Sequence, residues 1–443
     1  MDFNTLSQVM KNAGVAGAGG AGFPTYAKLN MATEIIILNC AECEPLLKLH
    51  RQVLENHAEE ILYALSVIAE TVEASKVIIA VKPAYKEAIA AVNKIIKNYK
   101  NTEIGLLPEI YPAGDGVVTI YETTGRVVPP GKLPIRVGVT VFNVETVLNV
   151  ARALREEAPV TYKYITICGE VKNPVTLKAP MGITYGELIE MAGGATVENP
   201  VLIAGGPMTG MIAHKNDVVT KTSNAILVMP ENQYIVQKRL TPMEINMKRA
   251  MAVCCNCSMC TDLCSRNMLG HPIEPQKFMQ AVTSGMVTDT APYINTMFCS
   301  ACGLCEMYAC GQGLNPRTLI AATKSMLRKN GIKIPDDIEA APVPASRNYR
   351  TVPMERLKSR LGLDKYDVDA PLSEELVGTK KTKIMLSQTI GAPASACVKV
   401  GDSVKAGDVV GTFAENALSL PVHASLDGTV SEVTDKYVLI DVK

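Results

Sequence analysis

Two short runs of cysteine constrain this 443-residue chain more than any other feature. The first reads CCNCSMCTDLC over residues 254–264, and the second reads CSACGLCEMYAC over residues 299–310. Their spacings are C-x2-C-x2-C-x3-C and C-x2-C-x2-C-x4-C. A structural zinc ion usually takes its four ligands from two separated C-x2-C pairs, so the third closely spaced cysteine in each run disfavours zinc. Two structural zinc sites remain the alternative interpretation.

Three cysteines at positions i, i+3 and i+6 suit three corners of an iron–sulfur cube, and the fourth corner needs a more distant thiolate. In two-cluster ferredoxins the last cysteine of each run binds the other cluster. The spacing therefore predicts two [4Fe–4S] clusters, with Cys255 left as a thiol without a metal. The predicted ligands are Cys254, Cys257, Cys260 and Cys310 for cluster 1, and Cys299, Cys302, Cys305 and Cys264 for cluster 2. The extra residue in the second run leaves open which cluster takes Cys310.

Composition predicts the compartment and excludes two classes of partner. The N-terminus lacks the basic start and apolar core of a signal peptide. The formal net charge is zero, which gives no electrostatic footprint for nucleic acid. No apolar run approaches the roughly 20 residues that span a bilayer. We therefore expect a cytoplasmic protein with no nucleic-acid partner and no direct membrane insertion, whose 13 cysteines are metal ligands or redox groups.

The first 160 residues alternate between strand-like and helix-like segments. Short continuous apolar runs predict strands, and segments with helical periodicity separate them. The predicted strands are residues 34–40, 76–81, 103–107 and 137–143. This alternation is typical of an α/β domain with a parallel sheet.

The whole chain divides into five regions by pattern and composition. We expect an α/β domain over 1–160, a small β-rich module over 161–232, a helical cysteine domain over 245–330, a polar, proline-bearing linker over 331–378 and a β-rich domain over 379–443. The methionines of the cysteine domain are expected to pack around the clusters. They are Met243, Met247, Met251, Met259 and Met268.

A glycine-rich stretch, GAGGAGFPT at residues 17–25, lies near the N-terminus. Glycines have no Cβ, so their backbone N–H groups can approach a phosphate closely and form an anion-binding concavity. The stretch follows a predicted helix instead of a strand, so it lacks the context of the Rossmann glycine motif. Taken alone it is a weak signal, because many glycine-rich segments are simply turns.

Three motifs, taken in order, resemble a known family. GAGGAGFPTYAKL (17–29), NCAECEPLLK (39–48) and VTVFNVET (139–146) are similar to the flavin- and NADH-binding subunit of respiratory complex I, and closer to the RnfC family of electron-transfer subunits. Within that group the chain looks like the RnfC-like cobalamin reductases of propanediol-utilisation microcompartments. The resemblance covers nearly the whole chain. It implies a multidomain α/β fold: a Rossmann-like FMN/NADH domain, a β-grasp SLBB module, an α-helical two-[4Fe–4S] ferredoxin-like domain and a C-terminal β barrel-sandwich hybrid domain.

The resemblance also implies a site for FMN and NADH in which no side chain acts as a nucleophile. Glu42 and Glu44 would lie near the flavin ring and the nicotinamide, and Lys28 would neutralise phosphate charge. The implied cofactor-binding residues are Gly17, Gly19, Gly20, Gly22, Lys28, Asn39, Glu42, Glu44, Asp115, Asn143, Glu145 and Thr146. Asp115 belongs to a loop that matches the family pattern only in part. Cys40 and Cys43 are expected to be packed thiols that line this site, and none of the five histidines is expected to be a ligand.

The C-terminal region resembles a biotinyl or lipoyl domain. Such domains carry their cofactor on a lysine in a hairpin, but the corresponding hairpin here, FAENALSLP at 413–421, has no lysine. We therefore expect an unmodified structural module. The RnfC proteins of membrane complexes resembled here carry this domain at the N-terminus, whereas the cobalamin reductases carry it at the C-terminus, as this chain does.

The function implied by the resemblance is an NADH-dependent oxidoreductase of the cobalamin reductase type. Electrons would pass from NADH through FMN and the two clusters to cobalamin or another corrinoid, because a flavin accepts two electrons and releases them singly. An adenosyltransferase and microcompartment shell proteins are the implied partners, in the cytoplasm or inside a bacterial microcompartment. Two alternatives stay open: an RnfC-type NADH-oxidising subunit of a membrane-associated ferredoxin:NAD oxidoreductase, and a non-catalytic scaffold with structural clusters.

Overall fold

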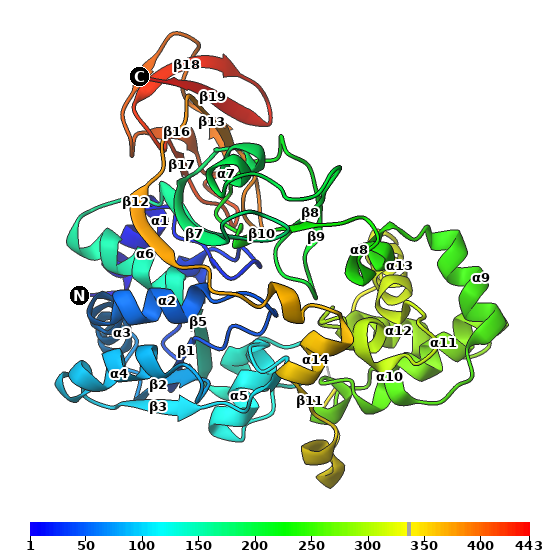
Figure 1. Cartoon of the computed structure of the whole chain (residues 1–443). Coiled ribbons are helices and arrows are strands. Elements are labelled where there is room, and N and C mark those ends of the chain that lie inside the picture. The colour runs from blue at the N-terminus through cyan, green and yellow to red at the C-terminus, as the bar shows by residue number, and fades with distance from the viewer. Residues whose placement is uncertain (335–337) are drawn as a thin grey trace.

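A four-stranded parallel sheet forms the centre of the N-terminal α/β domain (Figure 1). The computed structural model describes residues 1–334 and 338–443. The strand order is β3-β2-β1-β5, and all three pairs are parallel. The strands are β1 (Ile35–Asn39), β2 (Lys76–Val81), β3 (Thr102–Leu106) and β5 (Val139–Asn143). They coincide closely with the four apolar runs that predicted strands.

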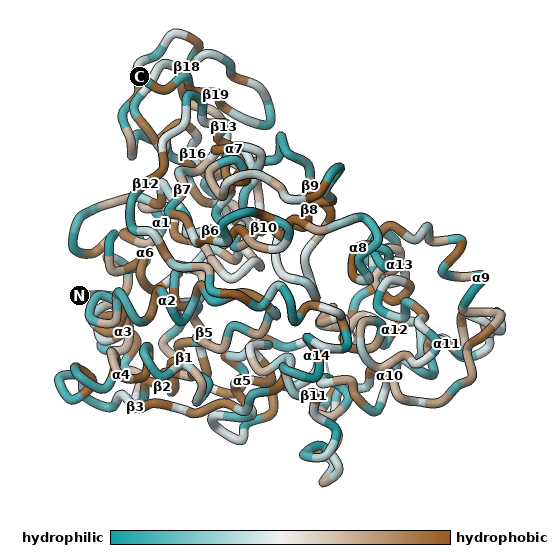
Figure 2. The backbone as a smooth tube through the Cα atoms, viewed as in Figure 1, coloured by the Kyte–Doolittle hydropathy of each residue, from teal (hydrophilic) through white to brown (hydrophobic). Residues whose placement is uncertain are grey.

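Both faces of this sheet are covered. Ile36 and Leu38 of β1 lie in one core, whereas Ile37 between them lies in a second core with helix α5 (Gly116–Thr124). Successive side chains of a strand point to opposite faces, so a continuous apolar run requires cover on both sides. Figure 2 shows apolar residues recurring along these strands. The helices of the first core are α1 (Phe3–Asn12), α2 (Leu49–Asn56), α3 (Ala58–Thr71), α4 (Lys86–Ile95) and α6 (Val144–Arg155).

A six-stranded mixed sheet forms the β-grasp module beside this domain, in the order β12-β7-β6-β10-β8-β9. Its strands are β6 (Tyr162–Gly169), β7 (Val175–Pro180), β8 (Val201–Ala204), β9 (Met211–Ala213), β10 (Ala225–Met229) and β12 (Leu372–Leu376). One helix, α7 (Tyr185–Met191), packs on the sheet. It begins with a capping box between Thr184 and Glu187, which satisfies backbone donors of its first turn.

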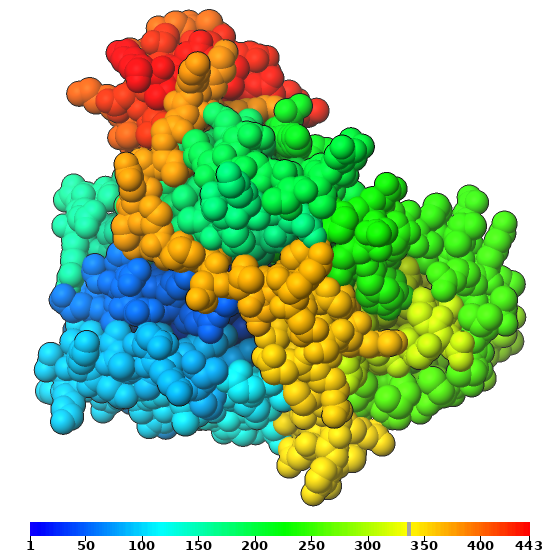
Figure 3. All heavy atoms as spheres, viewed as in Figure 1, coloured from blue at the N-terminus to red at the C-terminus, as the bar shows by residue number. Residues whose placement is uncertain are grey.

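The segment 331–378, expected to be a linker, instead adds elements to two parts of the fold. These elements are α14 (Met354–Arg360), β11 (Val352–Pro353), which pairs with β4 (Ile110–Tyr111), and β12, which pairs with β7. Residues 335–337 of the expected linker lie outside the described residues. Polar residues and prolines are frequent in this segment, so its composition does not reveal the few apolar side chains that are buried, among them Leu357 and Leu361. Figure 3 shows this segment, in orange, running over the surface between the blue and green regions.

The cysteine domain consists of short helices at one end of the molecule (Figure 1). They are α8 (Tyr234–Leu240), α9 (Met243–Val253), α10 (Met259–Asp262), α11 (Pro275–Ser284), α12 (Ala291–Ile294) and α13 (Pro316–Lys329). Its own core includes Ala250, Phe278, Met279, Leu314, Leu319 and Ile320. Met243, Met251 and Met259, expected to pack around the clusters, are exposed. The helices of this domain lie beside cysteine loops that face solvent, so they have too few neighbouring elements to bury every apolar side chain.

The C-terminal domain is a pair of small antiparallel sheets, ordered β13-β19-β18-β15 and β14-β16-β17. The strands are β13 (Lys381–Met385), β14 (Ser395–Ala396), β15 (Ser403–Val404), β16 (Val409–Thr412), β17 (Val422–His423), β18 (Gly428–Val433) and β19 (Tyr437–Val442). The hairpin without lysine contacts the first helix, since the Lys11 ammonium lies 3.9 Å from the centroid of the Phe413 ring.

A fully buried ion pair joins the α/β domain to the β-grasp module. Lys163 on β6 pairs with Glu145 in the first turn of α6, and both side chains are almost completely inaccessible to solvent. The Lys163 ammonium also donates to the Ala18 carbonyl and to Asn224 Oδ1, each at 3.2 Å. The Tyr164 N–H donates to the other oxygen of Glu145 at 3.1 Å. Buried charges are tolerated when they are paired and hydrogen-bonded in this way, so the pair fixes the relative position of the two units.

A second buried lysine joins three domains. The Lys221 ammonium of the β-grasp module donates to the Gly14 carbonyl of the α/β domain at 2.7 Å and to the Pro421 carbonyl of the C-terminal domain at 2.8 Å. Burial lowers the pKa of Lys221 to about 7. Neutral carbonyls offset little of the cost of removing an ammonium from water.

Replacing Lys163 by alanine should lower the free energy of unfolding by about 3–5 kcal/mol, because Glu145 would stay buried without a counter-charge. Urea or thermal unfolding of the full chain measures this loss. The matched control is Lys172→Ala, which removes an exposed lysine of the same module and should change the stability by less than about 0.5 kcal/mol. Equal effects of the two variants would contradict the role of the ion pair.

The wild-type protein should gain stability relative to Lys221→Met as the pH rises from about 7 to about 9. The unfolded chain holds this proton up to the ordinary pKa of 10.5, whereas the folded protein releases it near 7. The unfolded state therefore binds more protons in this window, so the free energy of unfolding increases with pH. Melting temperatures of both proteins across the window measure the difference. A difference that does not change with pH would show that Lys221 keeps its proton in the fold.

Candidate functional site

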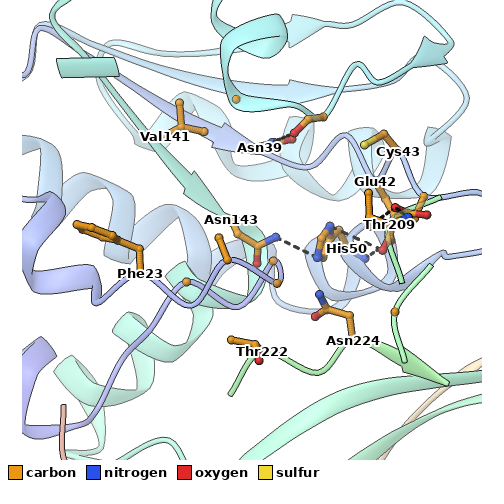
Figure 4. A pocket seen from close by; sticks show the side chains of 18 of the residues that line it. Phe23, Asn39, Glu42, Cys43, His50, Val141, Asn143, Thr209, Thr222 and Asn224 are labelled. Atoms are coloured by element: carbon orange, nitrogen blue, oxygen red, sulfur yellow. Dashed lines mark hydrogen bonds and ion pairs between the residues drawn. The ribbon is translucent and has the colours of Figure 1, made fainter. Parts of the chain in front are cut away.

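A cavity of about 1010 Å³ lies between the α/β domain and the β-grasp module (Figure 4). Asn39 and Asn143, the last residues of the paired strands β1 and β5, both line it. The strand order changes direction between these two strands, and ligands of open α/β sheets bind at the carboxyl ends beside such a switch point. Ligand pockets usually enclose about 300–1,000 Å³, so this cavity is at the upper end of that range and has room for a large cofactor.

The glycine loop forms one wall of the cavity. The loop folds back on itself, because the Gly17 N–H donates to the Phe23 carbonyl at 2.8 Å and the Gly22 N–H donates to the Gly17 carbonyl at 3.2 Å. Gly20 has a φ of +107°, which side chains rarely permit, and a Cβ on Gly19 would lie 3.2 Å from Asn143 Nδ2.

The loop presents free donors to the cavity. In the described parts of the chain, the N–H groups of Gly19, Gly20 and Ala21 have no hydrogen-bond acceptor, and all three residues line the cavity. Adjacent free amides form a concavity that binds anions, so this wall fits a phosphate group.

Lys28 provides a cation beside this wall. It ends a 3-10 helix (Thr25–Lys28) and donates to the Val141 carbonyl at 3.1 Å. Among the described residues that line the cavity, Lys28 is the one lysine or arginine. Burial lowers the pKa of Lys28, and an anionic ligand would favour its charged form.

Asn143 has a fixed orientation at the start of α6. Its Oδ1 accepts from the Glu145 and Thr146 N–H groups, at 3.0 and 3.4 Å. This leaves its Nδ2 to donate to His50 Nε2 at 2.9 Å, the contact drawn in Figure 4. His50 Nε2 therefore acts as the acceptor, which assigns the ring proton to Nδ1.

His50 also contacts the first carboxylate of the cavity. The His50 backbone N–H donates to Glu42 Oε2 at 2.8 Å, and its Nδ1 lies 3.8 Å from Glu42 Oε1. Glu42, His50 and Asn143 thus form a polar chain along one wall. Sequence reasoning missed His50, because no motif marks it and only the packing of α2 brings it to Asn143.

Glu44 binds the wall of the cavity that the β-grasp module forms. Its carboxylate accepts from the Met208 and Thr209 N–H groups at 2.8 and 2.9 Å, and from the Thr209 hydroxyl at 2.5 Å. Burial raises the pKa of Glu44, although these hydrogen bonds oppose the shift. Glu44 therefore holds a loop of the β-grasp module against the α/β domain.

Eight of the twelve predicted cofactor residues line the cavity: Gly17, Gly19, Gly20, Lys28, Asn39, Glu42, Glu44 and Asn143. Their roles toward a ligand stay predictions. The other four do not line the cavity, and each contacts another part of the protein.

Each of these four residues has a different partner. Asp115 caps α5 and pairs with Arg266 at 2.8 Å. The Gly22 carbonyl accepts from the Ile390 N–H at 3.0 Å. Thr146 Oγ1 accepts from the Ala18 N–H at 2.8 Å, and Glu145 pairs with Lys163 as described above. Their side chains or carbonyls are already used by the protein.

The β-grasp module supplies a wall that the sequence did not indicate. Its contributions include Tyr185, Thr209, Thr220, Thr222, Ser223 and Asn224. These residues lie far beyond the glycine loop in the sequence, and only the docking of the two domains makes them neighbours. Cys43 also lines the cavity, where burial raises its pKa to about 12, whereas Cys40, expected to line it too, is buried in the core of the α/β domain. The strand period points Cys40 inward.

The eight candidate cluster ligands fall into two groups of four. The outer thiol set lines one small cavity and consists of Cys254, Cys257, Cys260 and Cys310. The inner thiol set consists of Cys264, Cys299, Cys302 and Cys305. Burial, together with the nearby Cys302 and Cys299, raises the pKa of Cys264 to about 12. Cys310 thus lies with the first run and Cys264 with the second.

This arrangement fits two cubanes, each of which needs four thiolates. No three His, Cys, Asp or Glu side chains within the described ranges are placed to hold a single metal ion. Backbone donors already point at the sulfurs: the Ala301 N–H donates to Cys299 Sγ and the Leu314 N–H to Cys310 Sγ, both at 3.3 Å. The assignment of each ligand to a cluster stays a prediction.

Four known domain families match parts of this chain. The Nuo51 FMN-binding domain matches residues 10–152, the SLBB domain residues 164–212, a 4Fe-4S dicluster domain residues 253–315 and the RnfC barrel sandwich hybrid domain residues 369–441. The multidomain α/β fold expected from the sequence is thereby confirmed, as are FMN and [4Fe–4S] clusters as cofactors.

Two relatives match almost end to end. The cobalamin reductase PduS of Citrobacter freundii is 38% identical over 440 residues, covering 99% of this chain and 97% of the relative. PduS of Salmonella typhimurium is 38% identical over 436 residues, covering 98% and 96%. A component of the Na(+)-translocating ferredoxin:NAD(+) oxidoreductase complex of Acetobacterium woodii is 32% identical over 270 residues, covering 60% and 58%.

A solved structure shares the fold. An NAD+-reducing [NiFe]-hydrogenase in the H2-reduced state aligns with a TM-score of 0.50 and 19% identity. The alignment covers 76% of this chain and 64% of that chain.

Replacing Lys28 by methionine should weaken FMN binding to the apoprotein by about 10- to 100-fold, since a charged hydrogen bond contributes about 1.5–3 kcal/mol. Titration followed by flavin fluorescence measures the dissociation constant. Riboflavin, which has no phosphate, is the matched ligand and should bind the variant and the wild type alike. An equal loss for both flavins would show that Lys28 does not contact the phosphate.

Proposed function

Because the chain belongs to the family of RnfC-like cobalamin reductases, we propose that it reduces cobalamin with electrons from NADH. It is an NADH-dependent oxidoreductase with FMN and two [4Fe–4S] clusters as cofactors. The observation that carries the proposal is a large cavity with free glycine amides whose walls contact the inner set of two sets of four thiols.

When bound, FMN supplies the step from a two-electron donor to one-electron carriers, and the clusters supply those carriers. The protein's own residues bind the flavin and the nicotinamide and orient them. Lys28 and the free amides of the glycine loop would hold the phosphate, and Phe23 and Val141 offer apolar surface to the ring. Orientation of two reactants in one cavity accounts for a large part of a rate enhancement without any nucleophilic side chain.

The polar chain of Glu42, His50 and Asn143 has a positioning role. Its hydrogen bonds fix the side chains, so the wall that faces the ligands does not need to reorganise. The β-grasp wall closes the opposite side, and Glu44 holds it there through Met208 and Thr209. Closure of this kind excludes water from the reacting groups.

The relatives support the acceptor that we propose. The two near-complete matches are named cobalamin reductases, which supports cobalamin as the electron acceptor. Reduced cobalt is what adenosylation requires, so we propose that an adenosyltransferase receives the reduced corrinoid and that microcompartment shell proteins are further partners. Of the helices in the described ranges, none has the length and apolar character to cross a bilayer.

The second candidate function is that of an NADH-oxidising subunit in an ion-translocating complex. The Acetobacterium woodii relative from such a complex shares 32% identity, but only over 60% of this chain. The near-complete match to cobalamin reductases favours the first function. A third alternative is a non-catalytic scaffold with structural clusters. It does not account for the FMN domain and its cavity.

The protein purified without oxygen should contain about one FMN and about eight irons per chain, and NADH should reduce cob(III)alamin in its presence. Flavin and iron analysis and the corrinoid absorbance measure these properties. Added FMN should restore activity to Lys28→Met, whose flavin is lost but whose cysteines are intact. Normal flavin reduction by NADH, combined with electron transfer to ferredoxin and none to any corrinoid, would support the second candidate instead.

A further inference from the structure

We propose that electrons leave the cavity through the inner thiol set (Cys264, Cys299, Cys302 and Cys305) and reach the acceptor only through the outer thiol set (Cys254, Cys257, Cys260 and Cys310). This order rests on the proposed function. It assigns to one set the contact with the flavin site and to the other the contact with the acceptor. Three separate contacts support the first half of the order, and the exposure of the outer set supports the second.

The loop before α5 is the first contact. Gly114 and Gly116 line the cavity, and the Gly114 carbonyl accepts from Asn39 Nδ2 at 2.8 Å. Three residues earlier, at the end of β4, the buried Tyr111 hydroxyl donates to the Cys302 carbonyl at 2.5 Å. A single short segment therefore touches the cavity on one side and the inner thiol set on the other.

The second contact is an ion pair from the same loop. Asp115, between the two cavity glycines, pairs with Arg266 at 2.8 Å, and both side chains are largely buried. Arg266 follows Cys264 by two residues. This pair holds the Cys264 end of the inner thiol set against the loop that lines the cavity.

The third contact passes through the β-grasp module. Glu44 lines the cavity and accepts from the Met208 N–H at 2.8 Å. A Cβ on Gly303 would lie 3.2 Å from the Met208 carbonyl, so the residue after Cys302 packs directly on this loop. Cys43 of the cavity and Cys302 pack against the same apolar core, which includes Leu46, Tyr111, Met208 and Leu304.

The outer thiol set has different surroundings. The residues that line its cavity all come from the segment 254–316, so neither the α/β domain nor the β-grasp module contributes to it. Cys254 and Cys310 pack on the separate core of the cysteine domain. Cys299 packs on that core too, so it lies between the two sets.

The outer thiol set is also the one that faces solvent. Cys257 is exposed, whereas Cys305 of the inner set is buried. Met251, shortly before the first run, and Met259, within it, are exposed as well. The other members of both sets are half-buried, so the two sets differ at Cys257 and Cys305. A one-electron acceptor can therefore approach the outer set at Cys257, whereas no cysteine of the inner set is exposed.

The electron count is balanced by two acceptor molecules. Oxidation of one NADH gives NAD+, one proton and two electrons. With clusters held by the two sets, the electrons would pass singly from the inner set to the outer set, so two molecules of cob(III)alamin would become cob(II)alamin for each NADH oxidised.

Two cysteine variants test the order. Cys302→Ser and Cys257→Ser each disrupt one set, and rapid-freeze electron paramagnetic resonance after mixing with NADH detects which cluster is reduced. In Cys257→Ser we expect an NADH-reduced inner cluster and loss of corrinoid reduction. In Cys302→Ser we expect normal flavin bleaching, with an outer cluster that dithionite reduces and NADH does not. Reduction of the outer cluster by NADH in Cys302→Ser would overturn the order.

A cysteine substitution can remove both clusters, so a second variant that keeps all eight cysteines is needed. Tyr111→Phe deletes the hydroxyl that donates to Cys302 and keeps every thiol. We expect full flavin and iron content, unchanged flavin bleaching by NADH, and cluster reduction slowed severalfold. The matched control is Tyr293→Phe, whose hydroxyl donates to the Met286 carbonyl at 2.8 Å within the cysteine domain, and which should behave as the wild type.

The possible results of these experiments distinguish a failure of the electron-transfer order from a failure of the proposed function. Wild-type cluster reduction rates in Tyr111→Phe would overturn the route through this loop. Absence of flavin bleaching by NADH in the wild-type holoprotein would instead refute the proposed function, and the route with it. Flavin bleaching followed by reduction of the outer cluster before the inner one would refute the route alone.

Discussion

The buried pair of Lys163 and Glu145 is the interaction on which the site depends. Each charge would be costly alone, because removing an ion from water is repaid only by a well-placed partner. The same ammonium donates to Ala18 in the glycine loop and to Asn224 in the β-grasp wall. One cation thus sets the distance between two opposite walls of the cavity. The carboxylate it needs belongs to α6, whose N-cap is Asn143, so the third wall is tied to the same point.

This arrangement explains why family motifs and ligand contacts do not coincide fully. Residues 143–146 form one motif, but Asn143 faces the cavity, Glu145 binds Lys163 and Thr146 binds the glycine loop. A helix start directs successive side chains to different sides. A motif of this kind therefore records both the ligand site and the contacts that keep it in shape.

Local patterns in the sequence predicted the features that depend on neighbouring residues, namely the strands and the cysteine motifs. Short apolar runs located the strands of the parallel sheet, and cysteine spacing divided the thiols into groups of three plus one. The rule for two-cluster ferredoxins predicted the partners of Cys310 and Cys264, and the fold places these two residues beside those partners. Tertiary contacts within and between domains were not predictable in this way. His50 and the β-grasp wall were missed for the same reason.

The expected linker shows the opposite case, in which composition was misleading. Prolines and charges are frequent in residues 331–378, and the helical spacing of Met354, Leu357 and Leu361 covers only about two turns. Burial of Leu357, Leu361 and Leu363 nevertheless fixes the segment. Such a segment becomes recognisable only when the surface that receives it is known.

Strand β12 has a consequence for biosynthesis. It covers the β7 edge of the six-stranded sheet, yet it begins at Leu372, long after the other strands end at Met229. An uncovered edge offers unpaired backbone groups to other chains. While the ribosome makes the cysteine domain and the segment beyond it, the nascent protein therefore carries an open β7 edge until Leu372–Leu376 has been made.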